Sequence, residues 1–382
     1  DVYKRQRNQC ANGLLKIQSI STTEGIIDSN NVNLSNQTII WNDSSNADWY
    51  EQFVKVMNAA LPVNTKIGRP NKKDTVDGIP VEQYQLNSNL QEIPVFTFSK
   101  NIDGRNTQFE VVSIDVNAGS VEELAPLPTN RLSCLYKDDG KGYASSNTGF
   151  FFHFRQGVLQ QGDFTVPLAT PNQIVSIDTD NINQTDVWLY SLNNNQVEQE
   201  LWTKVSATEG NNVIYNSTAK SIRNIYSVIT RTEDRINLQF ADGTFGNLPK
   251  GAFRIYYRVS DNRQFKIVPA DMTNIEIQVP YVSASGKNEI LTIAMSLQYT
   301  IDNASNSETS ASIRSNAPAT YYTQNRMITG EDYNILPYTL FNDILKIKAV
   351  NRTSSGISRY FELTDPTGRS SSINLFGTDG AL

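Results

Sequence analysis

The stretch "RINLQFADGTFGNLPKGAFRIYYRV", residues 235–259, decides the fold. Apolar residues alternate with polar ones over residues 236–240 and again over residues 253–259. A period of two is that of a strand with one buried face. Gly243 and Gly246 lie between the two runs and permit the positive φ of a tight turn. The stretch therefore predicts two strands, Ile236–Phe240 and Phe253–Val259, paired as a hairpin.

Similar strand patterns recur on both sides of this stretch. Residues 95–112, "VFTFSKNIDGRNTQFEVV", place an Asp-Gly pair between two apolar runs, which is a hairpin signal. Residues 149–156, "GFFFHFRQ", put Phe150, Phe152 and Phe154 on one strand face, and "TDVWLYSL" and "NIEIQV" indicate further strands. Residues 66–80, "KIGRPNKKDTVDGIP", are expected to form a loop.

Helical signals lie near the two ends of the chain. "SNADWYEQFVKVMNAALP", residues 45–62, groups apolar residues on one helical face. "NSETSASIRSNAP", residues 306–318, predicts a short helix that ends before Pro318. In "TGEDYNIL", residues 329–336, Thr329 as N-cap and Asp332 three residues on resemble a capping box. Pro337 is expected to end or kink this second helix.

These patterns predict a mainly β, α+β chain in three parts. Residues 1–125 form an N-terminal region with one helix and a hairpin, and residues 126–298 form a β-rich middle domain. Residues 299–382 form a C-terminal α+β unit that we expect to be incomplete. Because the chain starts at Asp1 and not at Met, we expect it to be an internal piece of a longer protein.

The composition argues against two classes of binding partner, nucleic acids and membranes. The chain has 33 Lys and Arg against 39 Asp and Glu, a net charge of −6. A mildly acidic surface argues against nucleic-acid binding, which rests largely on Lys and Arg. No window approaches the roughly 18 apolar residues of a membrane span, so no membrane partner is expected. Cys10 and Cys134 form no CxxC pair, which favours two free thiols.

The sequence offers little that could carry chemistry. His153 is the single histidine and lies in "FFFHF", which favours a strand histidine over a catalytic triad. "DTDNIN", residues 178–183, begins like a calcium loop but has Ile at a ligand position. The adjacent acids at 122–123 and 138–139 are expected to be solvated turn residues. We therefore predict no catalytic, metal or cofactor-binding residue, no cofactor and no small-molecule substrate.

The first stretch resembles the signature of baseplate J-like proteins. That signature is an apolar strand, then Gly-Asp-Gly-x-Phe-Gly, then Pro and a basic, aromatic strand. Ala241 stands where the family usually has Gly. The matching residues are Asp242, Gly243, Phe245, Gly246, Pro249 and Gly251.

A second segment, "SIRSNAPATYYTQNRMITGEDYNIL" at 312–336, resembles another run of the same family. The matching residues are Asn316, Ala317, Pro318, Tyr322, Thr323, Gln324, Asn325, Arg326, Glu331, Asp332 and Tyr333. "SSNTGFFFHFRQGVLQQGDF", "NINQTDVWLYSL" and "GISRYFELTDPTG" look like the wedge proteins of T-even-type phages in particular. The resemblance covers roughly Leu132 to the C-terminus.

The resemblance implies a structural subunit of the tail baseplate, located in the virion and assembled in the host cytoplasm, and not an enzyme. Such proteins join other wedge proteins, dimerise within a six-fold inner ring around the tail tube, and couple baseplate rearrangement to sheath contraction. Two alternatives stay open: a host-surface-binding fibre or adhesin, and a tail-associated glycosidase. Arg326 precedes Glu331 and Asp332, and we favour an internal ionic lock there over a contact with a neighbouring subunit.

Overall fold

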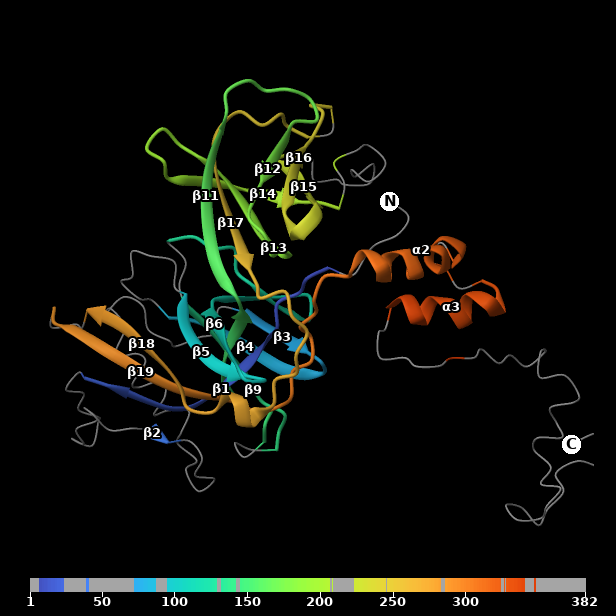
Figure 1. The fold of residues 1–382 in the computed structure, drawn as a ribbon. Coiled ribbons are helices and arrows are strands. Elements are labelled where there is room, and N and C mark those ends of the chain that lie inside the picture. Colours follow the sequence, from blue (N-terminus) through green and yellow to red (C-terminus); the bar gives the residue numbers. More distant parts are fainter. Residues whose placement is uncertain are drawn as a thin grey trace, which may run out of the picture. The chain divides into compact units, whose positions relative to one another are not determined.

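The computed structural model forms two compact units, one of residues 7–307 and one of residues 1–6 with 308–382. It describes residues 7–23, 39–40, 72–86, 95–128, 132–141, 145–206, 208, 223–244, 246–282, 286–323, 326, 328–340 and 347. Strands dominate and two α-helices are described, so the predicted mainly β, α+β class is confirmed (Figure 1).

The larger unit contains a 10-stranded sheet with the main order β18-β19-β1-β10-β9-β4-β3. Strand β10 branches, because β9 pairs with its first half and β6 with its second half. Strand β5 extends β6, and β2 pairs with β1. The strands are β1 (Asn12–Thr22), β2 (Ile39–Ile40), β3 (Lys72–Val76), β4 (Ile79–Leu86), β5 (Phe96–Ile102), β6 (Arg105–Val112), β9 (Leu132–Lys137), β10 (Gly149–Gln156), β18 (Ile275–Val282) and β19 (Asn288–Leu297).

Two hairpins of this sheet turn on an Asp-Gly pair. Asp103 (φ 51) and Gly104 (φ 77) join β5 to β6, as the sequence predicted. Asp77 (φ 51) and Gly78 (φ 76) join β3 to β4 in the same way, so the loop expected over residues 66–80 is wrong for 72–80. Two successive positive φ values match the twist of the flanking strands, which explains why both turns use this dipeptide.

Strand β10 has a different core on each face. Phe150, Phe152 and Phe154 are fully buried together, as predicted. Phe151 faces the opposite side and packs with Leu135 of β9. That side is covered by a small hairpin of β7 (Ile114–Asn117) and β8 (Ser120–Glu123). Burial on both faces explains why three consecutive phenylalanines occur in one strand.

The sheet combines strands from both sides of residue 125, where the sequence placed a domain boundary. Leu15 of β1 lies opposite Phe152 of β10 on one side and Leu297 of β19 on the other. Strand β1 is therefore a central strand between two much later segments. Such pairing depends on apolar faces that meet only after folding, and no local pattern reports it.

A 7-stranded sheet has the order β11-β17-β13-β14-β15-β16-β12. All pairs are antiparallel except β14 with β15, which is parallel. Two short 3₁₀ helices, η1 (Thr232–Asp234) and η2 (Pro269–Met272), complete the larger unit. The strands are β11 (Val158–Val166), β12 (Ile174–Ile177), β13 (Ile182–Leu192), β14 (Glu198–Lys204), β15 (Ile225–Thr230), β16 (Ile236–Phe240) and β17 (Gly251–Val259).

Both strands predicted from residues 235–259 form, but their predicted pairing is wrong. Strand β16 pairs with β12 and β15, whereas β17 pairs with β11 and β13. The sheet curls, so β16 and β17 meet through their side chains: the Phe240 and Phe253 rings are 5.9 Å apart between centroids. The intervening segment 241–250 is long enough to cross the core, unlike the two-residue turn of a tight hairpin.

The smaller unit contains α2 (Ser310–Thr323) and α3 (Gly330–Leu340). Pro318 and Pro337 lie inside these helices, so the predicted end before Pro318 is wrong and α3 does not end at Pro337. A proline removes one backbone hydrogen bond, while the remaining bonds on either side still hold the helix. The helix predicted over 45–62 lies outside the described residues. Neither described helix is long and apolar enough to cross a membrane.

Candidate functional site

The first signature segment connects β16 to β17, and its backbone conformation is fixed by a hydrogen bond and by glycines. The Thr244 backbone N–H donates to Asp242 Oδ1 at 2.8 Å, and Gly243 has φ +92. A Cβ on Gly246 would lie 2.7 Å from both Ala241 Cβ and Ile225 Cγ1, so only glycine fits there without a shift. Asp242, Gly243 and Gly246 thus set backbone shape, while Phe245 lies outside the described residues.

The second signature segment lies in the smaller unit. Asn316, Ala317 and Pro318 belong to α2, and Tyr333 belongs to α3 and is 48% exposed. Gln324 and Asn325 lie outside the described residues. The two signature segments therefore belong to different units of the chain.

The predicted capping box at the start of α3 is confirmed. The Asp332 N–H donates to Thr329 Oγ1 at 3.2 Å, and the Thr329 N–H donates to Asp332 Oδ2 at 2.7 Å. The Thr329 and Ile328 N–H groups lower the pKa of the Asp332 carboxyl, and the charge of Arg326 adds to this. Arg326 is exposed, and the side chain of Glu331 lies outside the described residues, so the internal lock stays a prediction.

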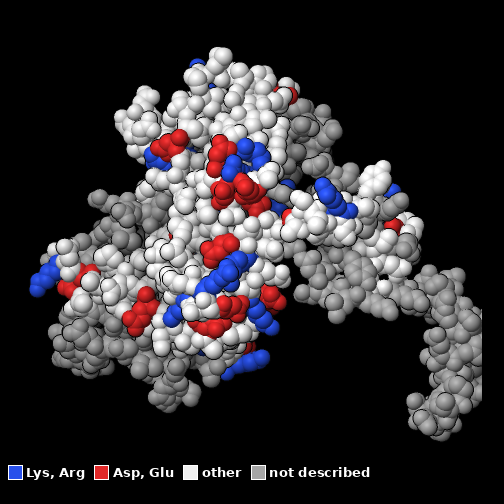
Figure 2. All heavy atoms as spheres, in the orientation of Figure 1, with Lys and Arg blue, Asp and Glu red and all other residues white. Residues whose placement is uncertain are grey.

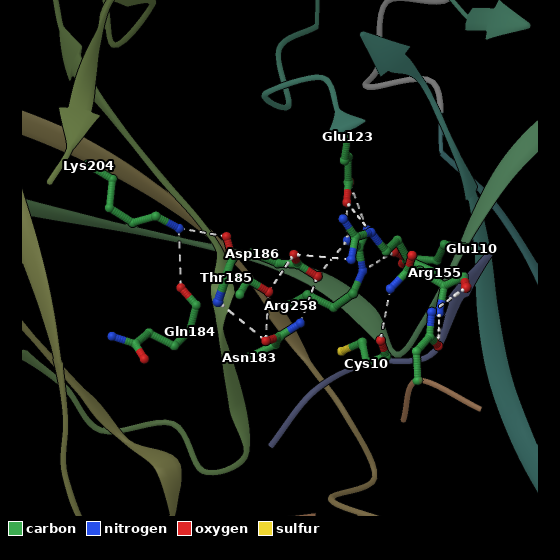
Figure 3. Close-up of polar contacts among 12 residues, drawn as sticks. Cys10, Glu110, Glu123, Arg155, Asn183, Gln184, Thr185, Asp186, Lys204 and Arg258 are labelled. Carbon is green, nitrogen blue, oxygen red and sulfur yellow. Dashed lines mark hydrogen bonds and ion pairs between the residues drawn. The ribbon is translucent and has the colours of Figure 1, made fainter. Parts of the chain in front are cut away.

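A buried ion network joins the strands of the two large sheets, and no sequence motif indicated it. Figure 2 shows acidic and basic side chains interspersed on one face of the molecule, whereas this network lies inside. Its centre is Arg258 of β17, which is 0% exposed. Arg258 Nη2 donates to Glu110 Oε2 at 2.8 Å and to Glu123 Oε1 at 3.0 Å (Figure 3). Arg258 Nη1 donates to Asp186 Oδ2 at 3.4 Å.

Three further strands supply the carboxylates that bind Arg258, and a fourth supplies a second arginine. Glu110 comes from β6, Glu123 from β8 and Asp186 from β13, and Arg155 of β10 lies 3.5 Å from Glu123 and 3.7 Å from Asp186. Figure 3 shows these side chains converging from the strands of both sheets. The network is therefore a polar joint between the 10-stranded and 7-stranded sheets, closed by the small β7–β8 hairpin.

The charges of the joint shift the pKa values of its members. Burial raises the pKa of the Glu123 carboxyl, Asp186 raises it further, and Arg258 and Arg155 oppose this. The pKa of Arg258 is raised well above its usual range, because the attraction of Glu123 and Asp186 outweighs its burial. The guanidinium of Arg258 therefore keeps its charge, and it does so in contact with three carboxylates.

Neutral groups complete the surroundings of the joint. Asn183 Nδ2 donates to Asp186 Oδ2 at 3.0 Å, and the Leu159 N–H donates to Glu110 Oε1 at 2.9 Å. Cys10 lies nearby, where burial and then the charge of Asp186 raise the pKa of its thiol. Cys10 and Cys134 are both buried and free, as expected. The bonds of Arg258 to three carboxylates fix the relative geometry of the strands that contribute them.

Two sequence-based expectations change here. The alternation of residues 253–259 placed Arg258 on the polar face, but that face meets the other sheet and Arg258 is fully buried. Glu123 was expected in a solvated turn, but its side chain is 3% exposed. Glu122 and Asp138 are exposed as expected. The only sequence feature near Glu123 is a pair of acids before a proline-containing linker. Such a pair does not indicate which of the two side chains is buried.

His153 and Asp139 complete the residues that the sequence singled out. His153 lies on β10, as expected, and is 3% exposed. Asp139 Oδ2 accepts from the Ser145 hydroxyl at 2.6 Å, and Asp139 Oδ1 accepts from the Thr148 hydroxyl at 2.7 Å. These bonds lower the pKa of Asp139 to about 2. Asp139 thus closes a loop, which is a structural role.

Comparison with known proteins assigns the chain to a family but not to an activity. No curated protein matches the sequence. A family model described as a domain of unknown function, DUF8360, matches residues 13–300. This range includes both large sheets and the ion network between them, which is more than half of the chain. The chain therefore belongs to the DUF8360 family, a domain of unknown function.

Proposed function

We propose that this chain is a structural, non-enzymatic subunit of a phage tail baseplate wedge, part of the inner ring around the tail tube. Two segments that resemble baseplate J-like proteins support the proposal. Asp242, Gly243 and Gly246 shape one connection, and Thr329 with Asp332 caps a helix. Signature residues that only fix the backbone geometry are consistent with a structural protein.

The observation that carries the proposal is the buried joint around Arg258. A subunit that passes baseplate rearrangement to the sheath has to transmit force between its parts without shearing. Arg258 bonds carboxylates from β6, β8 and β13, so the two sheets cannot slide past each other without leaving buried charges unpaired. An unpaired buried charge is costly, so the joint should resist sliding of one sheet past the other.

The proposed partners are other wedge proteins, with a homodimer of this chain inside a six-fold ring. Exposed residues of the smaller unit are candidates for such contacts, and Arg326 is among the exposed residues there. The exposed residues Tyr321, Ile328 and Tyr333 lie on the same two helices or between them. Aromatic and Arg side chains of this kind are enriched at protein interfaces.

Co-expression with the proteins encoded beside it tests the proposal. We expect the chain to co-purify with them as a defined wedge complex, visible by light scattering and by electron microscopy as arms or rings. Arg326→Ala should lower the thermal midpoint of the isolated chain through loss of the internal lock, while Arg314→Ala, on an exposed site of α2, serves as the matched control. An unchanged midpoint together with lost assembly would instead make Arg326 a contact residue. A trimeric fibre that binds host cells, or hydrolysis of peptidoglycan by the purified chain, would contradict the proposal and favour an adhesin or a glycosidase.

A further inference from the structure

His153 lies on the face of the 10-stranded sheet that the β7–β8 hairpin covers. Alternate residues of a strand share a face, so the side chains of Phe151, His153 and Arg155 of β10 point to the same side. Phe151 packs in one cluster with Val116 of β7, and Arg155 lies 3.5 Å from Glu123 of β8. The hairpin therefore contacts both neighbours of His153 on this face and covers the imidazole between them.

The imidazole of His153 is enclosed without a hydrogen bond. The residue is 3% exposed, and both ring nitrogens are buried and have no hydrogen-bond partner among the described residues. Burial lowers the pKa of His153 well below its usual 6.5, and the charges of Arg155 and Arg258 lower it further. The ring is therefore neutral in this position, since an imidazolium here would be a buried charge beside two guanidinium groups.

The elements packed around this position contribute further ionisable groups. The cations are Arg155 on β10 itself, Lys16 on β1, Lys137 on β9 and Arg258 on β17. The acids are Glu110 on β6, Glu123 on β8 and Asp186 on β13, and all three are ion-paired with Arg258. Asp77 and Asp302 are exposed, and burial raises the pKa values of the Cys10 thiol and the Tyr299 phenol, which keeps both neutral. These surroundings disfavour a further positive charge on His153.

Beyond the joint, side chains of β3 and β4 attach the hairpin to the sheet. The Val116 N–H donates to Gln83 Oε1 at 3.1 Å, and the Gly119 N–H donates to Asp74 Oδ2 at 3.1 Å. Both acceptors lie outside the hairpin, so both bonds break if the hairpin lifts from the sheet. The Val116 and Gly119 amides therefore report on the position of the hairpin.

A hollow of about 690 Å³ opens beside the hairpin turn. Residues 119–121 line it from the turn, Tyr299 and Asn303 line it from the segment after β19, and His153 lines it from β10. The ring nitrogens themselves stay enclosed. Because the hollow already lies next to His153, an outward movement of the turn exposes the imidazole to solvent without unfolding the sheet.

We propose that the β7–β8 hairpin is an acid-released flap and that His153 is its trigger. Protonation places a charge at an enclosed position that disfavours one. The charge is relieved when the hairpin lifts and the hollow widens to admit water. Lifting also uncovers Phe151 and the apolar cluster around it, so the apolar surface is presented under acidic conditions. This proposal does not depend on the proposed baseplate function.

The direction of the pH dependence follows from the pKa of the imidazole in the two forms. In the open flap the pKa of His153 is its usual 6.5, and in the closed flap it is well below this. Above pH 6.5 the imidazole is neutral in both forms and the closed flap has its full stability. Below pH 6.5 the open form binds the proton first, so the closed flap loses stability as the pH falls. The ratio of open to closed forms should rise about tenfold from about pH 7.5 to about pH 5.5.

Glu123 contributes to the pH dependence with the opposite sign. Burial raises the pKa of its carboxyl, so protonation of Glu123 favours the closed flap as the pH falls. The effect of His153 is therefore isolated by comparing the unmutated chain with a variant that lacks the imidazole at each pH.

Amide hydrogen exchange of the full chain measures the opening. The Val116 and Gly119 N–H groups report on the flap, and the Phe240 N–H, which donates to the Gln173 carbonyl at 2.9 Å in the 7-stranded sheet, is the internal control. We expect exchange at Val116 and Gly119, relative to the intrinsic rate, to become about tenfold faster from about pH 7.5 to about pH 5.5. It should change less than about twofold at Phe240. Equal acceleration at Phe240 would overturn the proposal, because the whole unit would then be loosening.

Two variants link the opening to the imidazole. His153→Gln keeps a neutral polar side chain but does not titrate, so the acceleration at Val116 and Gly119 should disappear. Thr107→Val is the matched control, because Thr107 is also fully buried with an unpartnered hydroxyl and does not titrate. This control should keep the full pH dependence. Acceleration that persists in His153→Gln would overturn the proposal.

The single histidine gives a readout that needs no variant. In the full chain labelled with ¹³C,¹⁵N-histidine, the one imidazole signal reports on His153. We expect the signal of the closed form to stay that of a neutral imidazole down to about pH 5.5. Titration of this signal near pH 6.5 while Val116 and Gly119 remain protected would refute the trigger, as would unchanged exchange at both amides over the whole pH range.

Discussion

Replacing Arg258 by methionine tests whether the buried joint stabilises the larger unit. The variant keeps a side chain of similar length but removes the cation that bonds Glu110, Glu123 and Asp186. Arg155 then remains as the nearby cation, and it lies 3.5 Å from Glu123 and 3.7 Å from Asp186. Removing one member of a buried ion pair costs about 3–5 kcal/mol, so we expect the free energy of unfolding to fall by about this amount.

Urea unfolding followed by tryptophan fluorescence measures the effect, because Trp202 lies in the core of the 7-stranded sheet. The control is Arg235→Met, since Arg235 and its partners Asp180 and Glu233 are 37%, 51% and 60% exposed at their side chains. We expect this exposed arginine to contribute under about 1 kcal/mol.

A double variant tests why stability is lost in Arg258→Met. Adding Glu110→Gln to Arg258→Met removes one of the carboxylates left without its partner, so part of the lost stability should return. The reasoning would be refuted if Arg258→Met cost no more than Arg235→Met, or if the second substitution only added to the loss. The first result would mean that the joint contributes no more than a surface pair does.

Three further predictions rest on single contacts. Gly246→Ala should lower the free energy of unfolding by about 1–3 kcal/mol because its Cβ would overlap its neighbours, whereas Gly162→Ala, with its nearest contact at 3.7 Å, should change it little in the same urea titration. Asp139 has its pKa lowered from 3.8 to about 2 by the hydroxyls of Ser145 and Thr148, so its contribution to stability is complete above pH 3.8 and disappears as the pH falls through about 2. The difference in thermal midpoint between the unmutated chain and Asp139→Asn should therefore vanish over this window, and a constant difference would contradict the assignment. Thr329→Ala should destabilise the start of α3 by about 1 kcal/mol, seen as faster amide exchange in its first turn, whereas Thr329→Ser should not.

The sequence predicted local geometry well where one residue type has one physical consequence. The alternation over residues 236–240 and 253–259 identified two strands, and Asp103-Gly104 identified a hairpin, because both signals act over a few residues. Thr329 and Asp332 identified a capping box for the same reason. The identical Asp-Gly signal at residues 77–78 was lost among the surrounding polar residues, although it forms the same turn.

Which strands pair with one another could not be predicted from such local signals. Residues 236–240 and 253–259 are neighbours in the sequence, yet they face each other across a core and pair with other strands. A strand pattern states that one face is buried, but it does not state which strand lies beside it. That choice depends on how the whole sheet curls, which involves every strand from β11 to β17.

What the sequence by itself determined is therefore the mainly β class, the positions of several strands and of the Asp103-Gly104 turn, and the residues that resemble a baseplate family. Only the tertiary structure decided that Arg258 and Glu123 are buried partners, since they are 135 positions apart and lie on strands of different sheets. The physical reason is that burial of a charged group depends on what the folded chain places over it, and alternation along a strand carries no information about that cover.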